Sequence, residues 1–362
     1  MALTQAPAKR LFDRLTSGRR LRLYVWLSLA TQILIVVTGG LVRLTGSGLG
    51  CPTWPKCTDE SLISTPEMGI HGLIEFGNRL LTIVLLVVAL LTFITIIRPH
   101  PGKRELARIT IAFFAFVALF IVGLVFATIA IDALSISILA TASIGMLAMA
   151  AVFVMAAKKY ETKGLAIPAF GLGFGIILQA VVGGITVLTQ LNSWIVGLHF
   201  LISSVLIALA SVLVFRALPK PASDTCPAAR ALRIPVIAVS VVTIVIGVLV
   251  TGAGPHAGDA LTPRNGLDLE LWQHYHSYPG YLMLALVSVQ WFLQTRRSKS
   301  VINNLASRTL TILLLTTIAQ ALIGIAQARL GVPPFLVALH MLGAAMLSSL
   351  ITFQFLALRN SK

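Results

Sequence analysis

Apolar runs of about twenty residues or more recur along the chain, and each is long enough to cross the hydrocarbon core of a bilayer as one helix. Hydrophobic residues make up 57% of the sequence and charged residues only 11%, which excludes a water-soluble protein. We therefore expect an all-α integral membrane protein with about ten transmembrane helices. The expected spans are 24–44, 72–97, 108–130, 134–157, 166–189, 194–215, 234–254, 273–294, 309–329 and 334–357.

The net charge of +16 would suit a nucleic-acid-binding protein, but the basic residues are not placed for that function. They lie before the first span and after every second span, at Lys9 to Arg22, Arg98 to Arg108, Lys158 to Lys163, Arg216 to Arg233, Arg296 to Arg308, and Arg359 with Lys362. The opposite loops carry acidic residues such as Glu67 and Asp268. This positive-inside pattern predicts a multi-pass protein with both termini in the cytoplasm, an uncleaved first span and no nucleic-acid partner.

Two segments of the sequence match each other without a gap. The first contains Gln179, Gly183 and His199, and the second contains Gln320, Gly324 and His340, with 20 residues from Gln to His in both. The tetrapeptide Thr-Gly-Ser-Gly at 45–48, which leaves the first span, also resembles Thr-Gly-Ala-Gly at 251–254, which leaves the seventh. The sequence therefore predicts a four-helix unit that occurs twice, as spans 1, 2, 5 and 6 and again as spans 7 to 10.

Spans 3 and 4 have no counterpart in the second unit, so we interpret them as an inserted two-helix hairpin. Both units then begin on the cytoplasmic side and have the same orientation. This disfavours a transporter built from inverted repeats, but a parallel-repeat transporter stays open.

The histidines gather near the outer side of the membrane, apart from His100 in a cytoplasmic loop. His71 opens the second span, His274 and His276 open the eighth, His199 and His340 lie just inside the sixth and tenth, and His256 lies in an outer loop. A lone intramembrane histidine can serve as an interhelical hydrogen-bonding group. Its repetition at one position of both units instead favours ligation of iron, or of heme held axially between two helices.

In the second unit His340 would pair with His276 or His274. Two residues apart on a helix, these two side chains point about 200° apart, so only one can face the iron. We favour His276, which lies deeper in the membrane.

Glu75 lies near the outer end of span 2, where a carboxylate must be paired, hydrogen-bonded or protonated. His71 lies one turn before it and Arg79 one turn after it, so the three side chains share a helix face. One interpretation is a structural network of these three residues. The other is a proton-handling carboxylate beside a reacting ligand.

Two further groups have two interpretations each. Arg43 and Arg329 lie near the outer membrane surface, where they can snorkel or pair with the carboxylates of a bound cofactor. Cys51 and Cys57 lie in the first outer loop, where a disulfide or two free thiols are possible. A zinc site is disfavoured because this loop holds no histidine.

These motifs together resemble the heme A synthase family. The resemblance rests on residues 38–57 (TGGLVRLTGSGLGCPTWPKC), residues 74–79 (IEFGNR) and the two Gln-to-His repeats. It covers most of the chain except spans 3 and 4.

The resemblance implies a bacterial plasma-membrane enzyme that oxidises a ring methyl of heme O to the formyl group of heme A. It implies heme b as a cofactor between His276 or His274 and His340, and heme O as the substrate facing His199. It further implies that Glu75 is the catalytic carboxylate, with His71, Asn78 and Arg79 beside the substrate, and that Cys51 and Cys57 form a disulfide. Heme O synthase, the cytochrome oxidase assembly machinery and an unidentified electron donor are the implied partners.

The chain departs from the family at three places. Asn78 stands where the family commonly has a histidine, so the first-half iron would be held by His199 alone or would recruit His71. The outer loop at 255–272 lacks a second cysteine pair, and the hairpin is additional. A b-type cytochrome that only relays electrons would explain the histidines but gives Glu75 no task, whereas a parallel-repeat transporter would not explain histidines in both halves.

The expected organisation is a sequence of seven segments. These are a basic cytoplasmic N-terminus at 1–23, the first part of the first-half bundle at 24–104, the inserted hairpin at 105–160, the second part of that bundle at 161–217, a cytoplasmic linker at 218–233, the second-half bundle at 234–358 and a tail at 359–362.

Overall fold

A computed structural model describes residues 7–130, 136–160, 164–219, 224–297, 301 and 304–359, without the side chains of 7–10 and 121–144. Lys163 and Lys362, two of the basic residues named above, lie outside the described residues. The described helices are α1 (Pro7–Leu15), α2 (Leu21–Leu44), α3 (Gly69–Ile97), α4 (Lys103–Ala130), α5 (Ile136–Tyr160), α6 (Ala166–Leu188), α7 (Ser193–Ala217), α8 (Pro227–Ala231), α9 (Arg233–Ala253), α10 (Leu269–Arg297), α11 (Leu305–Arg329) and α12 (Pro334–Arg359). The described chain contains no strand, so the prediction of an all-α protein is confirmed.

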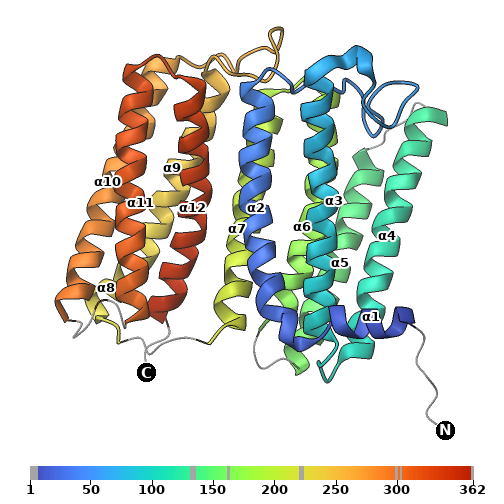
Figure 1. Ribbon diagram of the computed structural model, residues 1–362, viewed down its shortest axis with the longest axis horizontal. Helices are drawn as coiled ribbons and strands as arrows, with labels where there is room; N and C mark the ends of the chain where they lie inside the picture. The colour runs from blue at the N-terminus through green and yellow to red at the C-terminus, as the bar shows by residue number, and fades with distance from the viewer. Residues whose placement is uncertain are drawn as a thin grey trace.

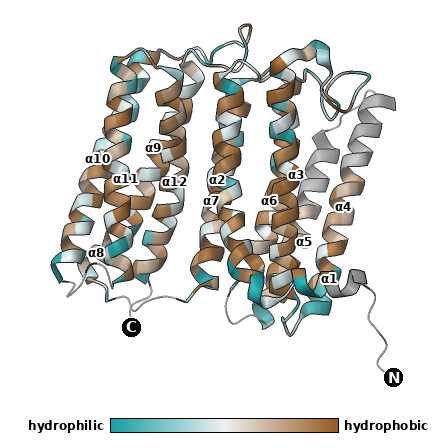
Figure 2. Cartoon of the chain, in the orientation of Figure 1, coloured by the Kyte–Doolittle hydropathy of each residue, from teal (hydrophilic) through white to brown (hydrophobic). Residues whose placement is uncertain are grey.

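Each of the ten expected spans coincides with one long helix. The helices α1 and α8 are short and match none of these spans. Within the described residues, seven helices are long and apolar enough to cross a membrane, namely α2, α3, α6, α7, α9, α11 and α12. The helix α10 is less apolar because it carries Gln273, His274, His276, Gln290 and Gln294. In Figure 2 the helices are brown along most of their length and teal mainly near their ends, as expected for a membrane-embedded bundle.

The helices pack as two four-helix groups with a hairpin at one side (Figure 1). In the first group α2 packs against α3, α3 against α6, α6 against α7, and α7 against α2. In the second group α9, α10, α11 and α12 pack in the same cyclic order. The helices α4 and α5 pack mainly against each other, and α2, α7, α9 and α12 join the two groups. This grouping agrees with the predicted duplication and places α4 and α5 outside both four-helix groups.

Aromatic side chains attach the hairpin to the first group. The Phe153 ring of α5 stacks on the Phe170 ring of α6 with centroids 4.0 Å apart, and Phe113 of α4 meets Phe170 edge-on at 5.0 Å. Both Phe113 and Phe153 are fully buried. Burial of rings of this size accounts for the fixed position of α4 and α5 beside α6.

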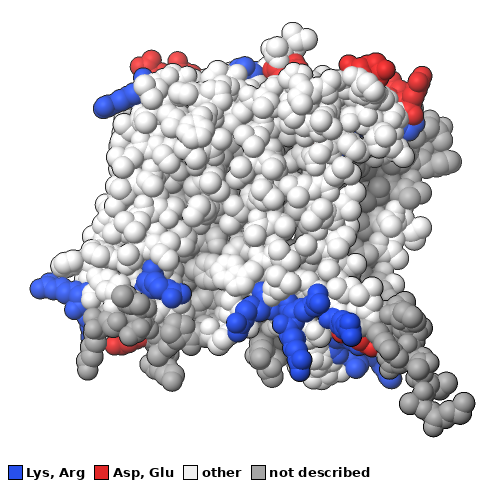
Figure 3. All heavy atoms as spheres, in the orientation of Figure 1, with Lys and Arg blue, Asp and Glu red and all other residues white. Residues whose placement is uncertain are grey.

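Both chain ends lie at the same face of the molecule (Figure 1), and lysine and arginine side chains gather at that face in Figure 3. Acidic side chains gather at the opposite face in the same view. The helix α1 lies across the basic face, where Asp13 forms an ion pair of 2.5 Å with Arg98 and Tyr24 donates a hydrogen bond to the Leu15 carbonyl. The charge distribution supports the predicted orientation of the chain.

Candidate heme-binding and carboxylate sites

Two histidine rings face each other in the second bundle. His276 of α10 and His340 of α12 have ring centroids 6.2 Å apart. The Nδ1 atom of each ring is buried, and that of His340 has no hydrogen-bond partner in the described part of the protein. Each metal–imidazole bond is about 2 Å long, so a separation of this size suits one metal atom between the two rings. The pair therefore fits the axial ligands of a heme.

Small residues and a repeated hydrogen bond set the position of these rings. A Cβ atom on Gly247 of α9 would lie 2.8 Å from Cε1 of His276, and one on Gly324 of α11 would lie 3.3 Å from Cε1 of His340. Gln320 of α11 donates a hydrogen bond of 2.9 Å to the His340 carbonyl. The neighbouring helices thus leave room for each ring and fix the backbone that carries His340.

The fully buried core of the second bundle lies in the half nearer the basic face. There the core includes buried Val236, Met283, Leu310 and Leu313. At the level of the two histidines, the segments 241–251, 269–282, 321–329 and 334–344 contain no buried residue. Packing around His276 and His340 is therefore looser than in the rest of the bundle, as a planar cofactor between the helices would require.

The first bundle repeats one half of this arrangement. His199 of α7 lies against Gly183 of α6, where a Cβ atom would be 3.3 Å from its Cε1. Gln179 donates a hydrogen bond of 2.8 Å to the His199 carbonyl, as Gln320 does to His340. The Nδ1 atom of His199 is also buried without a partner among the described residues. The repeated glutamines were visible in the sequence, but their contact with the histidine carbonyl was not predicted.

Glu75 is buried, with 5% of its surface exposed, and both of its oxygens are engaged. Oε1 accepts hydrogen bonds from Arg79 at 2.6 Å and 3.1 Å, and Oε2 accepts one of 2.6 Å from the backbone N–H of Cys51. Arg79 also donates to the carbonyls of Cys51, Thr53 and Lys56. Charge-assisted bonds of this kind are strong in a water-poor setting, so Glu75 and Arg79 hold the outer loop on α3.

Of the structural network that was one interpretation of His71, Glu75 and Arg79, the structure contains the pair of Glu75 and Arg79 but not His71. The His71 side chain is exposed, and its Nδ1 forms a hydrogen bond of 2.9 Å with the Ser47 hydroxyl instead. The Cys51 N–H takes the place beside Glu75, because the chain leaving α2 passes over α3 at this level. No feature of the sequence predicts that a backbone N–H will donate a hydrogen bond to Glu75.

The structure separates the two histidines of α10. His276 lies against His340, whereas the side chain of His274 is exposed. This placement supports His276 as the partner of His340.

The outer loop between α2 and α3 covers the first bundle. A disulfide joins Cys51 and Cys57, as expected. The Trp54 ring inside this loop packs so closely on Gly184 of α6 that a Cβ atom there would lie 2.3 Å from it. The loop is therefore tied to α3 through Glu75 and Arg79 and to α6 through Trp54.

We predict that Cys51→Ser and Cys57→Ser lower heme A formation, the activity that the sequence resemblance implies, at least about tenfold. Loosening the loop shifts Glu75, and about 1.4 kcal/mol of lost transition-state stabilisation is a factor of ten. Heme bound in the second bundle should stay unchanged. Cys226→Ser, which alters a buried free cysteine far from this loop in the sequence, is the matched control. Peptide mapping without reductant that finds both loop cysteines as free thiols would contradict this prediction.

The Arg43 side chain donates hydrogen bonds to backbone carbonyls of the second bundle. Its Nη2 donates to the Thr251 carbonyl at 2.6 Å, and its Nε donates to the carbonyl of His256. His256 in turn hydrogen-bonds the Val332 carbonyl at 2.8 Å through Nε2. These contacts join the end of α2 to the outer loops of the second bundle, so Arg43 does not simply snorkel. Arg329 is exposed.

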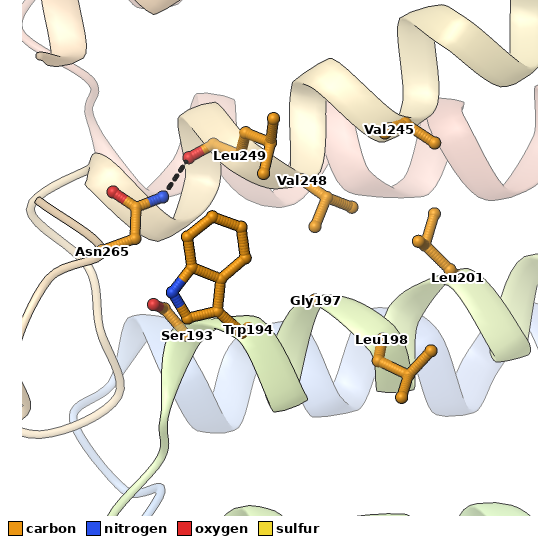
Figure 4. A pocket seen from close by; sticks show the side chains of 9 residues that line it. All are labelled: Ser193, Trp194, Gly197, Leu198, Leu201, Val245, Val248, Leu249 and Asn265. Carbon is orange, nitrogen blue, oxygen red and sulfur yellow. Dashed lines mark hydrogen bonds between the residues drawn. The ribbon is translucent and has the colours of Figure 1, made fainter. Parts of the chain in front are cut away.

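An apolar hollow of about 130 Å³ lies between α7 and α9, where the two bundles meet (Figure 4). It is lined by Ser193, Trp194, Gly197, Leu198, Leu201, Val245, Val248, Leu249 and Asn265. The Asn265 amide is turned to the Leu249 carbonyl, to which it donates a hydrogen bond of 2.8 Å. None of the predicted site residues lines this hollow, and ligand pockets are usually larger, at about 300 Å³ or more.

Among the described residues, no group of three or more His, Cys, Asp or Glu side chains lies close enough to hold a metal ion.

Fold and site together define a polytopic membrane protein with duplicated four-helix bundles and histidines at matching places. The model of one family, described as cytochrome oxidase assembly protein, matches residues 22–125 and 138–352. The chain belongs to this family, and the predicted resemblance is confirmed. The match includes most of α4 and α5, so the expectation that the resemblance leaves out spans 3 and 4 is wrong.

Curated relatives match shorter segments. The heme A synthase of Lysinibacillus sphaericus is 35% identical over 78 residues, which is 21% of this chain and 24% of that protein. The heme A synthase of Geobacillus thermodenitrificans is 31% identical over 68 residues, or 19% of this chain and 20% of that protein. A protein of Thermus thermophilus named protoheme IX farnesyltransferase is 35% identical over 83 residues, or 23% of this chain and 13% of that protein. The matched segments thus span a quarter or less of each relative.

Proposed function

We propose that this protein is a heme A synthase, which oxidises a porphyrin ring methyl of heme O to a formyl group through successive hydroxylations and loss of water. The observation that carries the proposal is the pairing of His276 with His340 at 6.2 Å, together with the matching placement of His199 in the other bundle. Family membership and the two relatives named heme A synthase support it.

In this proposal His276 and His340 hold heme b in the second bundle. The bound heme b supplies one-electron transfer to the site in the first bundle. Gln320 fixes the backbone of His340, and Gly247 and Gly324 keep the space beside the rings open. These residues act on the orientation of the cofactor and not on the substrate.

The first bundle receives heme O as the substrate, with His199 as its iron ligand. Hydroxylation of the ring methyl requires protons to be delivered or removed beside the porphyrin, and Glu75 is the carboxylate that would transfer them. Arg79 and the Cys51 N–H hold Glu75 in place. The loop that carries the disulfide and Trp54 limits the entry of water from the outer side.

The membrane setting and the partners follow from the same proposal. The basic face of the molecule, with both chain ends, lies in the cytoplasm of a bacterial cell. A heme O synthase supplies the substrate, and the cytochrome oxidase assembly machinery uses the product. The match to a protein named protoheme IX farnesyltransferase supports the first of these partners. The electron donor is a separate component.

The experiment that tests this function is expression of the chain in cells that make heme O but lack their own heme A synthase. Hemes are then extracted from the membranes and separated by chromatography. We expect heme A to appear only in cells that express the chain. Membranes that contain the folded protein and heme O but no heme A would contradict the proposal.

A further inference from the structure

One residue breaks the symmetry between the two bundles. In the second bundle, His276 of α10 faces His340 of α12 across the ring of four helices. In the first bundle, α3 and α7 occupy the matching places, because α2, α3, α6 and α7 pack in the same cyclic order. The helix α7 carries His199, which matches His340. The helix α3 carries Asn78 where α10 carries His276.

The equivalence of Asn78 and His276 is supported by their neighbours. Each lies against a glycine of the first helix in its bundle. A Cβ atom on Gly39 of α2 would be 3.8 Å from Nδ2 of Asn78, and one on Gly247 of α9 would be 2.8 Å from Cε1 of His276. Asn78 therefore occupies the position in the first bundle that corresponds to His276, but its side chain is an amide and not an imidazole.

The Asn78 amide contacts the Thr38 hydroxyl of α2. Its Oδ1 accepts a hydrogen bond of 2.8 Å from the Thr38 hydroxyl of α2. In the described part of the chain, its Nδ2 donates to no protein atom. An amide nitrogen carries its protons and has no lone pair available for iron, so it can donate a hydrogen bond but cannot act as a ligand.

His71 does not fill the missing ligand position either. Its side chain is exposed, and its Nδ1 is bound to the Ser47 hydroxyl at the outer end of α2. His199, in contrast, is largely buried against Gly183 and has a partnerless Nδ1. A single histidine is thus placed to hold an iron in this bundle.

We infer that the first bundle holds the iron of its heme substrate through His199 alone, and that Asn78 is a hydrogen-bond donor directed to the open side of that iron. This inference rests on the proposed function. One axial position of the substrate iron stays free for a small ligand, whereas the heme b between His276 and His340 has none free. The two hemes of one protein molecule therefore differ in spin state.

The test uses the full-length protein purified with heme b and then loaded with ferric heme O. Electron paramagnetic resonance and optical spectra should show a low-spin heme from the second bundle and a new high-spin heme from the first. Cyanide should convert only the high-spin heme to low spin. His199→Ala should remove the high-spin signal and keep the low-spin signal, which reports that the variant is folded.

Three further variants test the role of Asn78. Asn78→His should give a low-spin first-half heme before cyanide is added. Asn78→Ala should keep the high-spin heme but weaken cyanide binding about fivefold, as expected for one lost hydrogen bond. Thr38→Val, which removes the hydroxyl that contacts the amide, should also weaken cyanide binding, but by a smaller factor. Unchanged cyanide affinity in Asn78→Ala would contradict the donor role.

Two outcomes separate this inference from the proposed function. A wild-type protein whose added heme O is low-spin, and becomes high-spin only in His71→Ala, would overturn the inference and leave the proposed function intact. A wild-type protein that binds no added heme O, with the same result in His199→Ala, would overturn both.

Discussion

Replacement of His340 by alanine should remove most of the heme b from the purified protein. The substitution takes away one of two rings whose centroids are 6.2 Å apart, and the remaining ring cannot hold the iron from both sides. Loss of residues that only support metal ligands already costs about 10- to 100-fold in affinity, so loss of a ligand should cost more than that. Heme content per protein, measured from the pyridine hemochrome spectrum, gives the result directly.

The helix α10 offers a matched pair of variants for this prediction. His276→Ala should lose heme b as His340→Ala does, because its ring faces His340. His274→Ala should retain heme b, because its side chain is exposed on the same helix. Full heme content and an unchanged spectrum in His340→Ala would show that the ligand assignment is wrong. If His274→Ala and His276→Ala both retained their heme b, neither histidine would be a heme ligand.

Replacement of Glu75 by glutamine should abolish heme A formation while heme b stays bound in the second bundle. The amide preserves the shape of the side chain and can still accept the hydrogen bond from Cys51, but it cannot ionise. Loss of a general acid–base group typically costs about 10²–10⁴-fold in rate. We expect cells that express the variant to accumulate heme O or a partly oxidised heme, as chromatography of extracted hemes would show.

Because Glu75 also holds the outer loop, the Glu75→Gln experiment requires a control. Glu67→Gln removes a carboxylate that is exposed near the start of α3 and should leave heme A formation unchanged. Peptide mapping of Glu75→Gln should still find Cys51 joined to Cys57, which reports an intact loop. Normal heme A formation by this variant would leave Glu75 as a structural partner of Arg79 and Cys51.

The helices and their grouping could be predicted because membrane insertion imposes length and apolarity on each span. The duplication could be predicted because Gln179 and His199 recur at the same spacing in Gln320 and His340. The hydropathy of α10 is lower because it carries the polar residues of the site.

The contacts of the site were predicted less well. The sequence shows that His71 and Glu75 share a helix face, but the structure turns His71 to Ser47 and brings the Cys51 N–H to Glu75. Such contacts depend on the path of the loop across α3, which has no periodic pattern. The choice between His274 and His276 likewise needed the position of α12.

The measurement that tests the central proposal most directly uses the purified protein in lipid nanodiscs, loaded with heme b, supplied with heme O and a chemical electron-transfer couple, and followed by mass spectrometry of the extracted heme. We predict that heme O is converted to a product with the mass and spectrum of heme A, and that Glu75→Gln under the same conditions is not active. Recovery of unchanged heme O from a wild-type protein that holds both hemes would contradict the assignment as a heme A synthase.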